Sequence, residues 1–140
     1  MIVFDTDVAS ELIKAAPDPR IATWADVLAT ADTAITVITA AELRLGVALL
    51  PDGRRKDELR QDVEWLVDEV FGGRVLPFDT MASAYYAEIR STRRRSGQPI
   101  HIGEAQIAAT CLRFGATLAT RNTKDFEGIG LELVNPWTAS

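Results

Sequence analysis

Four acidic side chains are spaced so that a fold could bring them together: Asp5, Glu42, Glu104 and Asp125. Asp5 directly follows the apolar run at residues 2–4, which has the composition of a short buried strand. In open parallel α/β sheets, ligands bind beyond the carboxyl ends of the strands, where such a residue would lie. Carboxylate oxygens suit Mg²⁺, and a metal held there could activate water for phosphodiester hydrolysis.

Each of these acids also has an ordinary structural interpretation. Asp5 could cap the helix that follows it, and Glu42 lies three residues after Thr39, which is the spacing of a capping box. Glu104 could complement the dipole of a helix whose first turn contains it, and Asp125 could be a turn residue. The residues alone therefore indicate an α/β domain that could bind a metal.

Short apolar runs alternate with segments of helical periodicity along the whole chain. This alternation is typical of a mostly parallel sheet covered by helices on both faces. Residues expected to cap helices are Thr6 or Asp7, Thr39, and Asp79 or Thr80. The expected strands are 2–4, 34–38, 75–78, 117–120 and 131–134, and the expected helices are 8–15, 21–30, 39–51, 54–70, 79–95 and 102–114.

Composition narrows the class of protein. The chain has 140 residues, which fits one domain, and its single cysteine, Cys111, lies in an apolar helical run. A lone cysteine cannot form an internal disulfide, so we expect a buried thiol and a reducing cytosol. No signal peptide or membrane-spanning run is apparent. The net charge of −5 disfavours a general nucleic-acid binder but is compatible with an enzyme whose acids hold a cation.

Three segments resemble the PIN-domain toxins of the VapC and FitB type. They are IVFDTDVASEL, TVITAAELRLGV, and GQPIHIGEAQIAATCLRFGATLATRNTKDF followed by GLELVNPW. The resemblance covers the whole chain in the family's order, and the last segment is the most specific. It implies a single PIN domain over residues 1–140, an α/β fold with a mostly parallel sheet of four or five short strands and helices on both faces.

The resemblance also implies a function. Such proteins are metal-dependent endoribonucleases that act as the toxin of a toxin–antitoxin pair, in the cytoplasm and without a membrane partner. On this basis Mg²⁺ or Mn²⁺ would be held by Asp5, Glu42 and Glu104. Asp125, in the family's fourth motif at LATRNTKDF, would join the catalytic acids. The implied partners are an RNA substrate, a VapB-like antitoxin and a second copy of the chain, with DNA contacted only through the antitoxin.

Further side chains fall in or near the matching motifs. Thr6, Thr120 and Asn122 could support the acids through hydrogen bonds. Arg93, Arg94 and Arg95 could contact RNA phosphates, because guanidinium groups pair with phosphate in bidentate fashion. The same arginines close a predicted helix, where cations also complement the dipole.

Three residues depart from the family pattern and leave alternatives open. Glu104 stands where the family normally has aspartate, Asp7 where asparagine is usual, and Asn122 where many members have another acid. An extra methylene moves a carboxylate by more than about 1 Å, whereas catalytic placement tolerates roughly 0.5 Å. One alternative is therefore a PIN-like protein with a weakened site that acts mainly by binding its antitoxin.

A second alternative is a haloacid-dehalogenase-like phosphatase. The segment FDTDV fits the opening motif of that class, with Asp5 as nucleophile and Asp7 as acid/base. That class also needs a lysine and a late acidic pair, for which Lys124 and Asp125 are poor substitutes. This alternative also leaves Glu42 unexplained.

Overall fold

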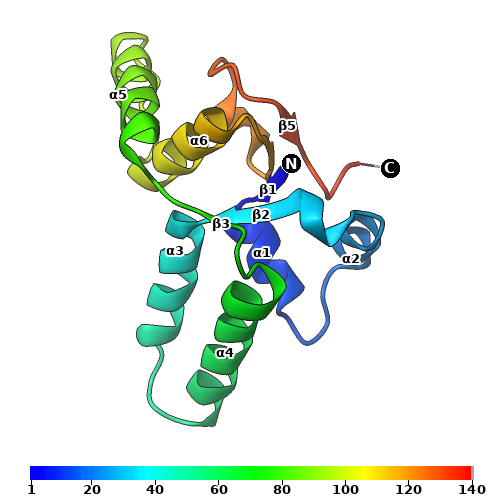
Figure 1. The fold of residues 1–140 in the computed structure, drawn as a ribbon. Helices are drawn as coiled ribbons and strands as arrows, with labels where there is room; N and C mark the ends of the chain where they lie inside the picture. Colours follow the sequence, from blue (N-terminus) through cyan, green and yellow to red (C-terminus); the bar gives the residue numbers. More distant parts are fainter. Residues whose placement is uncertain (140) are drawn as a thin grey trace.

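Five parallel strands form one sheet in the computed structural model, which describes residues 1–139 (Figure 1). The strand order is β3-β2-β1-β4-β5, so β1 lies at the centre between β2 and β4. The expectation of a mostly parallel sheet of four or five strands is confirmed. The strands are β1 (Ile2–Phe4), β2 (Thr33–Thr36), β3 (Val75–Leu76), β4 (Thr117–Ala119) and β5 (Leu133–Val134).

Six α-helices connect and cover these strands. They are α1 (Thr6–Leu12), α2 (Pro19–Asp26), α3 (Val37–Ala48), α4 (Arg54–Trp65), α5 (Thr80–Arg95) and α6 (Ile102–Phe114). The last of these matches the expected bounds, and Gly115 ends it in the left-handed conformation that favours glycine. Among residues 1–139, no helix combines the length and hydropathy needed to cross a bilayer.

The sheet separates two hydrophobic cores, because neighbouring residues of a strand face opposite sides. Val3 of β1 packs in the core beneath α5 and α6, whereas Phe4 packs in the core beneath α1, α2, α3 and α4. Ala34 and Ile35 of β2 divide in the same way. Figure 1 shows the α5–α6 pair on one side of the sheet and the other helices on the opposite side. The expected helices on both faces are confirmed.

Two of the expected helix caps are wrong. The N-cap of α1 is Asp5, one residue before the expected Thr6 or Asp7. The N-cap of α3 is Thr36, whose hydroxyl accepts a 3.1 Å hydrogen bond from the backbone N–H of Thr39. The β-branched pair after Thr36 extended the expected strand, although it begins the helix. Glu42 therefore lies in the second turn, and the capping box expected with Thr39 does not form.

The segment after α4 also departs from expectation. The helix expected over 54–70 changes at Leu66 into a π-helical turn that ends at Val70. A Cβ at Gly72 would lie 2.2 Å from the backbone oxygen of Asp68, so only glycine fits beside this widened turn. The turn leads the chain into β3, which is shorter than expected and ends at Leu76.

Candidate active site

Asp5 lies at the carboxyl end of the central strand, held by three backbone or side-chain contacts. Its backbone N–H continues the sheet by donating to the carbonyl of Ala119 (2.9 Å). Its Oδ1 accepts from the backbone N–H of Thr6 (2.8 Å), and its Oδ2 accepts from the hydroxyl of Thr120 (2.7 Å). Because Asp5 is only 7% exposed, these contacts fix its carboxylate in one orientation.

Burial has an electrostatic consequence for Asp5. Loss of hydration raises the pKa of its carboxyl above 3.8, although the hydrogen bonds from Thr120 and Thr6 oppose the shift. The negative charge of Asp125 raises the pKa further. A carboxylate in these surroundings gains from a nearby cation, since a positive charge would stabilise its ionised form.

Glu104 and Asp125 meet near Asp5. Glu104 lies in the first turn of α6, and Asp125 lies in the 3-10 turn Thr123–Phe126 that follows β4. Burial raises the pKa of Glu104 to about 7, and the neighbouring carboxyl group of Asp125 and the charge of Asp5 act in the same direction. The fold thus brings Asp5, Glu104 and Asp125 close enough together for the charge of Asp125 to raise the pKa of the other two.

Glu42 approaches the same region from α3. Its Oε1 lies only 2.9 Å from where a Cβ would stand on Gly103, the residue before Glu104. The missing side chain of Gly103 therefore leaves the space that the exposed Glu42 carboxylate occupies. All four predicted acids therefore lie near the carboxyl ends of the strands.

A threonine pair couples α1 to α3 and was not expected from the sequence. The hydroxyls of Thr6 and Thr39 share a 3.0 Å hydrogen bond, and Thr39 is fully buried. Thr6 thus supports Asp5 through its backbone N–H, while its hydroxyl reaches the helix that carries Glu42. The one hint in the sequence was a threonine placed three residues before that acid.

The remaining predicted supports occupy different roles. Thr120 is fully buried, and its Oγ1 also accepts from the backbone N–H of Asn122 (3.1 Å). Asn122 contributes that backbone group and is exposed. His101, which was not among the predicted supports, lies at the start of α6, where its Nδ1 accepts from the N–H of Gly103 (3.2 Å).

Asp7 is engaged by backbone amides on both oxygens. Oδ1 accepts from the N–H of Val8 (2.9 Å), and Oδ2 accepts from that of Arg121 (3.3 Å). Burial and the charge of Asp5 raise the pKa of Asp7 to about 6. These bonds leave Asp7 poorly placed for the acid/base role that a phosphatase mechanism would require.

The three arginines at the end of α5 have different surroundings. Arg93 donates from Nη2 to the backbone oxygens of Asp125 (2.9 Å) and Glu127 (2.8 Å), so it anchors the loop of a site acid. Arg94 lines a separate cavity. Arg95 is exposed and lies 3.5 Å from the hydroxyl of Thr92 on its own helix.

Whether the four acids suit a divalent cation depends on the distances between them and on their donor atoms. Within residues 1–139, no three Asp, Glu, His or Cys side chains stand close enough, as oriented, to hold a metal ion. The chemistry nevertheless fits, because the four acids offer only oxygen donors, which suit Mg²⁺ and Mn²⁺. Burial first, and the charges of neighbouring carboxylates second, raise the pKa values of Asp5 and Glu104, and a positive charge beside them would oppose both effects.

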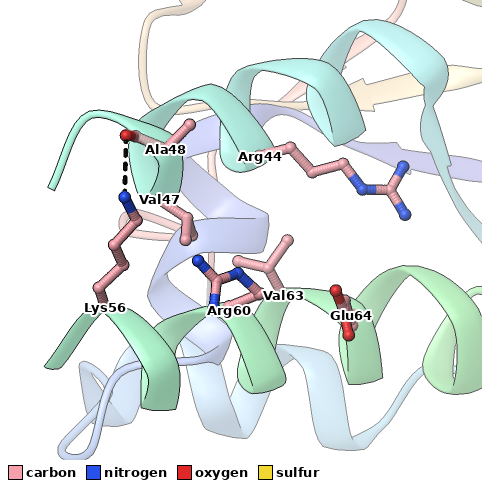
Figure 2. Close-up of a pocket in the computed structure, with 7 residues that line it drawn as sticks. All are labelled: Arg44, Val47, Ala48, Lys56, Arg60, Val63 and Glu64. Atoms are coloured by element: carbon pink, nitrogen blue, oxygen red, sulfur yellow. Dashed lines mark hydrogen bonds between the residues drawn. The ribbon is translucent and has the colours of Figure 1, made fainter. Parts of the chain in front are cut away.

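A cavity elsewhere in the fold contains none of these four acids. It has a volume of about 250 Å³ and lies between α3 and α4 (Figure 2). Lys56 spans one end of it and donates to the backbone oxygen of Ala48 (3.3 Å). The remaining lining residues are Arg44, Val47, Arg60, Val63 and Glu64.

The chain is similar to known proteins over nearly its whole length. Residues 2–130 match the model of the PIN domain. The chain is 42% identical over 137 residues to Toxin FitB of Neisseria gonorrhoeae, covering 98% of this chain and 99% of that protein. It is also 42% identical over 137 residues to VapC ribonuclease Y4jK of Sinorhizobium fredii, covering 98% of each.

Solved structures give the same result for the fold. The crystal structure of FitAcB from Neisseria gonorrhoeae superposes with a TM-score of 0.91 at 41% identity, covering 99% of this chain and all of that one. The structure of FitAB bound to an IR36 DNA fragment superposes with a TM-score of 0.92 at 40% identity, covering 100% of this chain and 98% of that one.

Proposed function

The chain belongs to the PIN-domain family, and on that premise we propose that it is a metal-dependent endoribonuclease, the toxin of a toxin–antitoxin pair. A relative that matches 98% of the chain is named a VapC ribonuclease, which supports RNA as the substrate. The phosphatase alternative receives no support, since the chain belongs to another family and both oxygens of Asp7 are bonded to backbone amides.

The observation that carries this proposal is the position of Asp5. It is buried at the carboxyl end of the central strand, fixed by Thr120, and exposed to the charge of Asp125. Burial raises the pKa of both Asp5 and Glu104, and the charges of neighbouring carboxylates raise these pKa values further, which a purely structural cap does not require. A cluster of this kind at this edge of a parallel sheet favours a bound cation.

We assign the acids distinct tasks. Asp5, Glu42 and Glu104 hold the ion, and Asp125 completes the acidic cluster from the opposite loop. When bound, Mg²⁺ or Mn²⁺ would lower the pKa of a water molecule and offset the charge that develops on the cleaved phosphodiester. Thr120 holds the Asp5 carboxylate in position through its hydrogen bond. The hydrogen bond between Thr6 and Thr39 joins α1 to α3, the helix that carries Glu42.

The test compares Asp5→Asn with the unchanged protein. Asparagine still caps α1, so the variant should fold while losing the carboxylate charge. We expect calorimetric titration with Mn²⁺ to show binding in the unchanged protein and none in Asp5→Asn, and RNA cleavage to disappear with it. Asp32→Asn is the matched control, because Asp32 is exposed just before β2, at the opposite end of the strands. An active Asp5→Asn enzyme would refute the site.

The weakened-site alternative makes a different prediction in the same titration. If Glu104 has compromised the cluster, the unchanged protein would bind Mn²⁺ as poorly as Asp5→Asn does. The chain would then act mainly by binding an antitoxin.

Relatives support the proposed partners. The FitAB structure carries a DNA fragment, and a VapBC2 complex from Rickettsia felis is bound to a fragment of its promoter, at 25% identity to this chain. We propose that this chain likewise binds a VapB-like antitoxin, that it meets DNA through that partner, and that it works in the cytoplasm.

We also propose a homodimer. Large apolar side chains are exposed on α3, which lies on one side of the sheet, and on α5 and α6, which lie on the other. A second copy of the chain would cover them. They are Val37 and Leu45 of α3, Met81 and Tyr85 of α5, and Ile102 of α6. Light scattering on the purified chain measures the mass directly, and a monomer at micromolar concentration would contradict this assembly.

A further inference from the structure

One face of α5 carries an arginine pair beside a cavity. Tyr86, Arg90 and Arg94 follow one another at intervals of four residues, so their side chains lie along one side of the helix. Together with Ala87, Ser91, Pro99 and Ile100 they line a cavity of about 540 Å³. This volume falls within the range of about 300–1,000 Å³ that is usual for ligand clefts. We call this surface the Arg90–Arg94 face.

The positive charges of this face are not neutralised. Among residues 1–139, seven lysine and arginine side chains form ion pairs with carboxylates, and Arg90 and Arg94 are not among them. Both side chains are exposed. In a chain whose net charge is −5, such a concentration of unpaired cations points to an anionic ligand.

Arg90 is held in place before any ligand arrives. Its Nη1 donates to the hydroxyl of Tyr86 (2.9 Å), and its guanidinium carbon lies 5.6 Å from the centre of that ring. Phe78 packs edge-on against the same ring, with 5.8 Å between ring centres. A guanidinium fixed in this way loses less freedom on binding than a free side chain would.

The last turns of α5, which carry the Arg90–Arg94 face, are bonded to the loop of a site acid. Arg93, from the neighbouring side of the helix, donates to the backbone oxygens of Asp125 and Glu127. Ile100, which lines the cavity, precedes Glu104 by four residues. A chain molecule that crosses the acids could therefore continue over the arginines.

We propose that the Arg90–Arg94 face binds the sugar–phosphate backbone of single-stranded RNA next to the scissile bond. This inference rests on the proposed ribonuclease function and revises the candidates for phosphate contact. Arg93 is already engaged by backbone carbonyls, and Arg95 does not line the cavity. Arg94 remains a candidate and Arg90 joins it, because bidentate guanidinium groups one turn apart can bind adjacent phosphates.

The test measures RNA binding without cleavage. Asp5→Asn protein is titrated into a short, unstructured RNA end-labelled with fluorescein, and anisotropy is recorded at several salt concentrations. The variant adds Arg90→Gln and Arg94→Gln. Its control adds Arg54→Gln and Arg55→Gln, which remove the same charge from exposed positions at the start of α4. Thermal melting verifies that each protein is folded.

We expect the Arg90/Arg94 variant to bind about tenfold more weakly or worse, and the Arg54/Arg55 control to bind nearly as the parent does. The slope of log affinity against log salt should fall by about 1.4, since each single-strand phosphate contact contributes about 0.7. An unchanged slope, or an equal loss in the control, would overturn the proposal.

Two further outcomes separate this inference from others. If the unchanged protein cleaves RNA, but adding Arg90→Gln and Arg94→Gln to Asp5→Asn does not weaken RNA binding, the face is not a substrate site and the proposed function stands. If the unchanged protein does not cleave RNA and Asp5→Asn does not bind it, both proposals fail. If labelled oligoglutamate of equal charge binds as tightly as the RNA and loses as much on substitution, the face receives an acidic protein segment, and the RNA assignment is overturned.

Discussion

The hydroxyl of Thr120 donates a 2.7 Å hydrogen bond to Oδ2 of Asp5, although the two residues are 115 positions apart in the chain. The same hydroxyl oxygen accepts from the backbone N–H of Asn122 (3.1 Å), which directs its hydrogen toward the carboxylate. Both side chains are buried. The fixed direction of Asp5 therefore depends on a residue of the fourth motif.

Thr120→Val should lower Mn²⁺ affinity about ten- to a hundredfold, because it removes the donor that orients a ligand carboxylate. It should also cost about 1–3 kcal/mol in the free energy of unfolding, since a buried oxygen loses its partner. Calorimetry and urea denaturation measure the two effects. Thr120→Ser retains the hydroxyl and should restore metal affinity; if it binds no better than valine, the hydrogen bond is not the cause.

Gly103→Ala should change the geometry of the candidate site without lowering the stability of the fold. The added Cβ would stand 2.9 Å from Oε1 of Glu42, a flexible group that can move away at little cost. We expect the unfolding free energy to hold or rise, because alanine favours helix by about 0.5–1 kcal/mol, while cleavage falls at least about tenfold. Gly46→Ala on α3 is the control, since nothing lies within 4 Å of its new Cβ. Equal activity in both variants would show that Glu42 is not required where it lies.

Glu104→Asp tests the departure from the family pattern. The shorter side chain should draw the carboxyl away from Asp125 and toward the position that the family's aspartate occupies. We expect metal affinity and cleavage to rise, by about tenfold for a shift of this size. Glu69→Asp, an exposed change after α4, serves as control in the same titrations. A fall in both quantities would mean that the site is built around glutamate.

Asp79 links pH to the packing of α5 on α6. Its Oδ1 accepts from the N–H of Ala82 (2.9 Å), and its Oδ2 lies 3.0 Å from Nε of Arg113. These contacts, the bond from Ala82 first, lower the pKa of Asp79 below 3.8. Because the folded state binds this proton less readily than the unfolded chain, the stabilisation exists above pH 3.8 and is lost as pH falls through the folded pKa.

Asp79→Ala should therefore lower the Tm at neutral pH, and its difference from the unchanged protein should shrink below pH 3.8. Asp79→Asn keeps a capping group without the charge, and its Tm should lie between those of Asp79→Ala and the unchanged protein. Thermal melts across the acidic range give the comparison. A difference that persists undiminished in acid would assign the effect to packing instead of ionisation.

Local signals predicted much of this architecture. Apolar runs bounded by glycine or polar residues located all five strands, and the periodicity of α6 with Gly115 behind it gave both ends of that helix. The same reasoning placed Asp5 at the end of a buried strand. Cys111 is buried, as its apolar neighbours predicted, and burial raises the pKa of its thiol.

Contacts between distant segments could not be predicted in the same way. Nothing local distinguishes Thr36 from Thr39 as a cap, because valine and isoleucine suit a strand as well as the first turn of α3. The engagement of Arg93 by the Asp125 loop spans 32 residues, and spacing alone does not reveal such a contact. Leu66 and Val67 of the π-helical turn after α4 are buried in the core, and their spacing in the sequence does not distinguish such a turn from continued α-helix.

The central place of β1 also bears on when the surroundings of Asp5 can form during synthesis. The pairing of β1 with β4 joins residues 2–4 to residues 117–119, and Thr120 follows directly. During translation Asp5 leaves the ribosome long before its strand neighbour and its hydroxyl donor, so early folding cannot complete the acidic cluster. Under the proposed function, a newly made chain would therefore become able to cleave RNA only after nearly all of it has been synthesised.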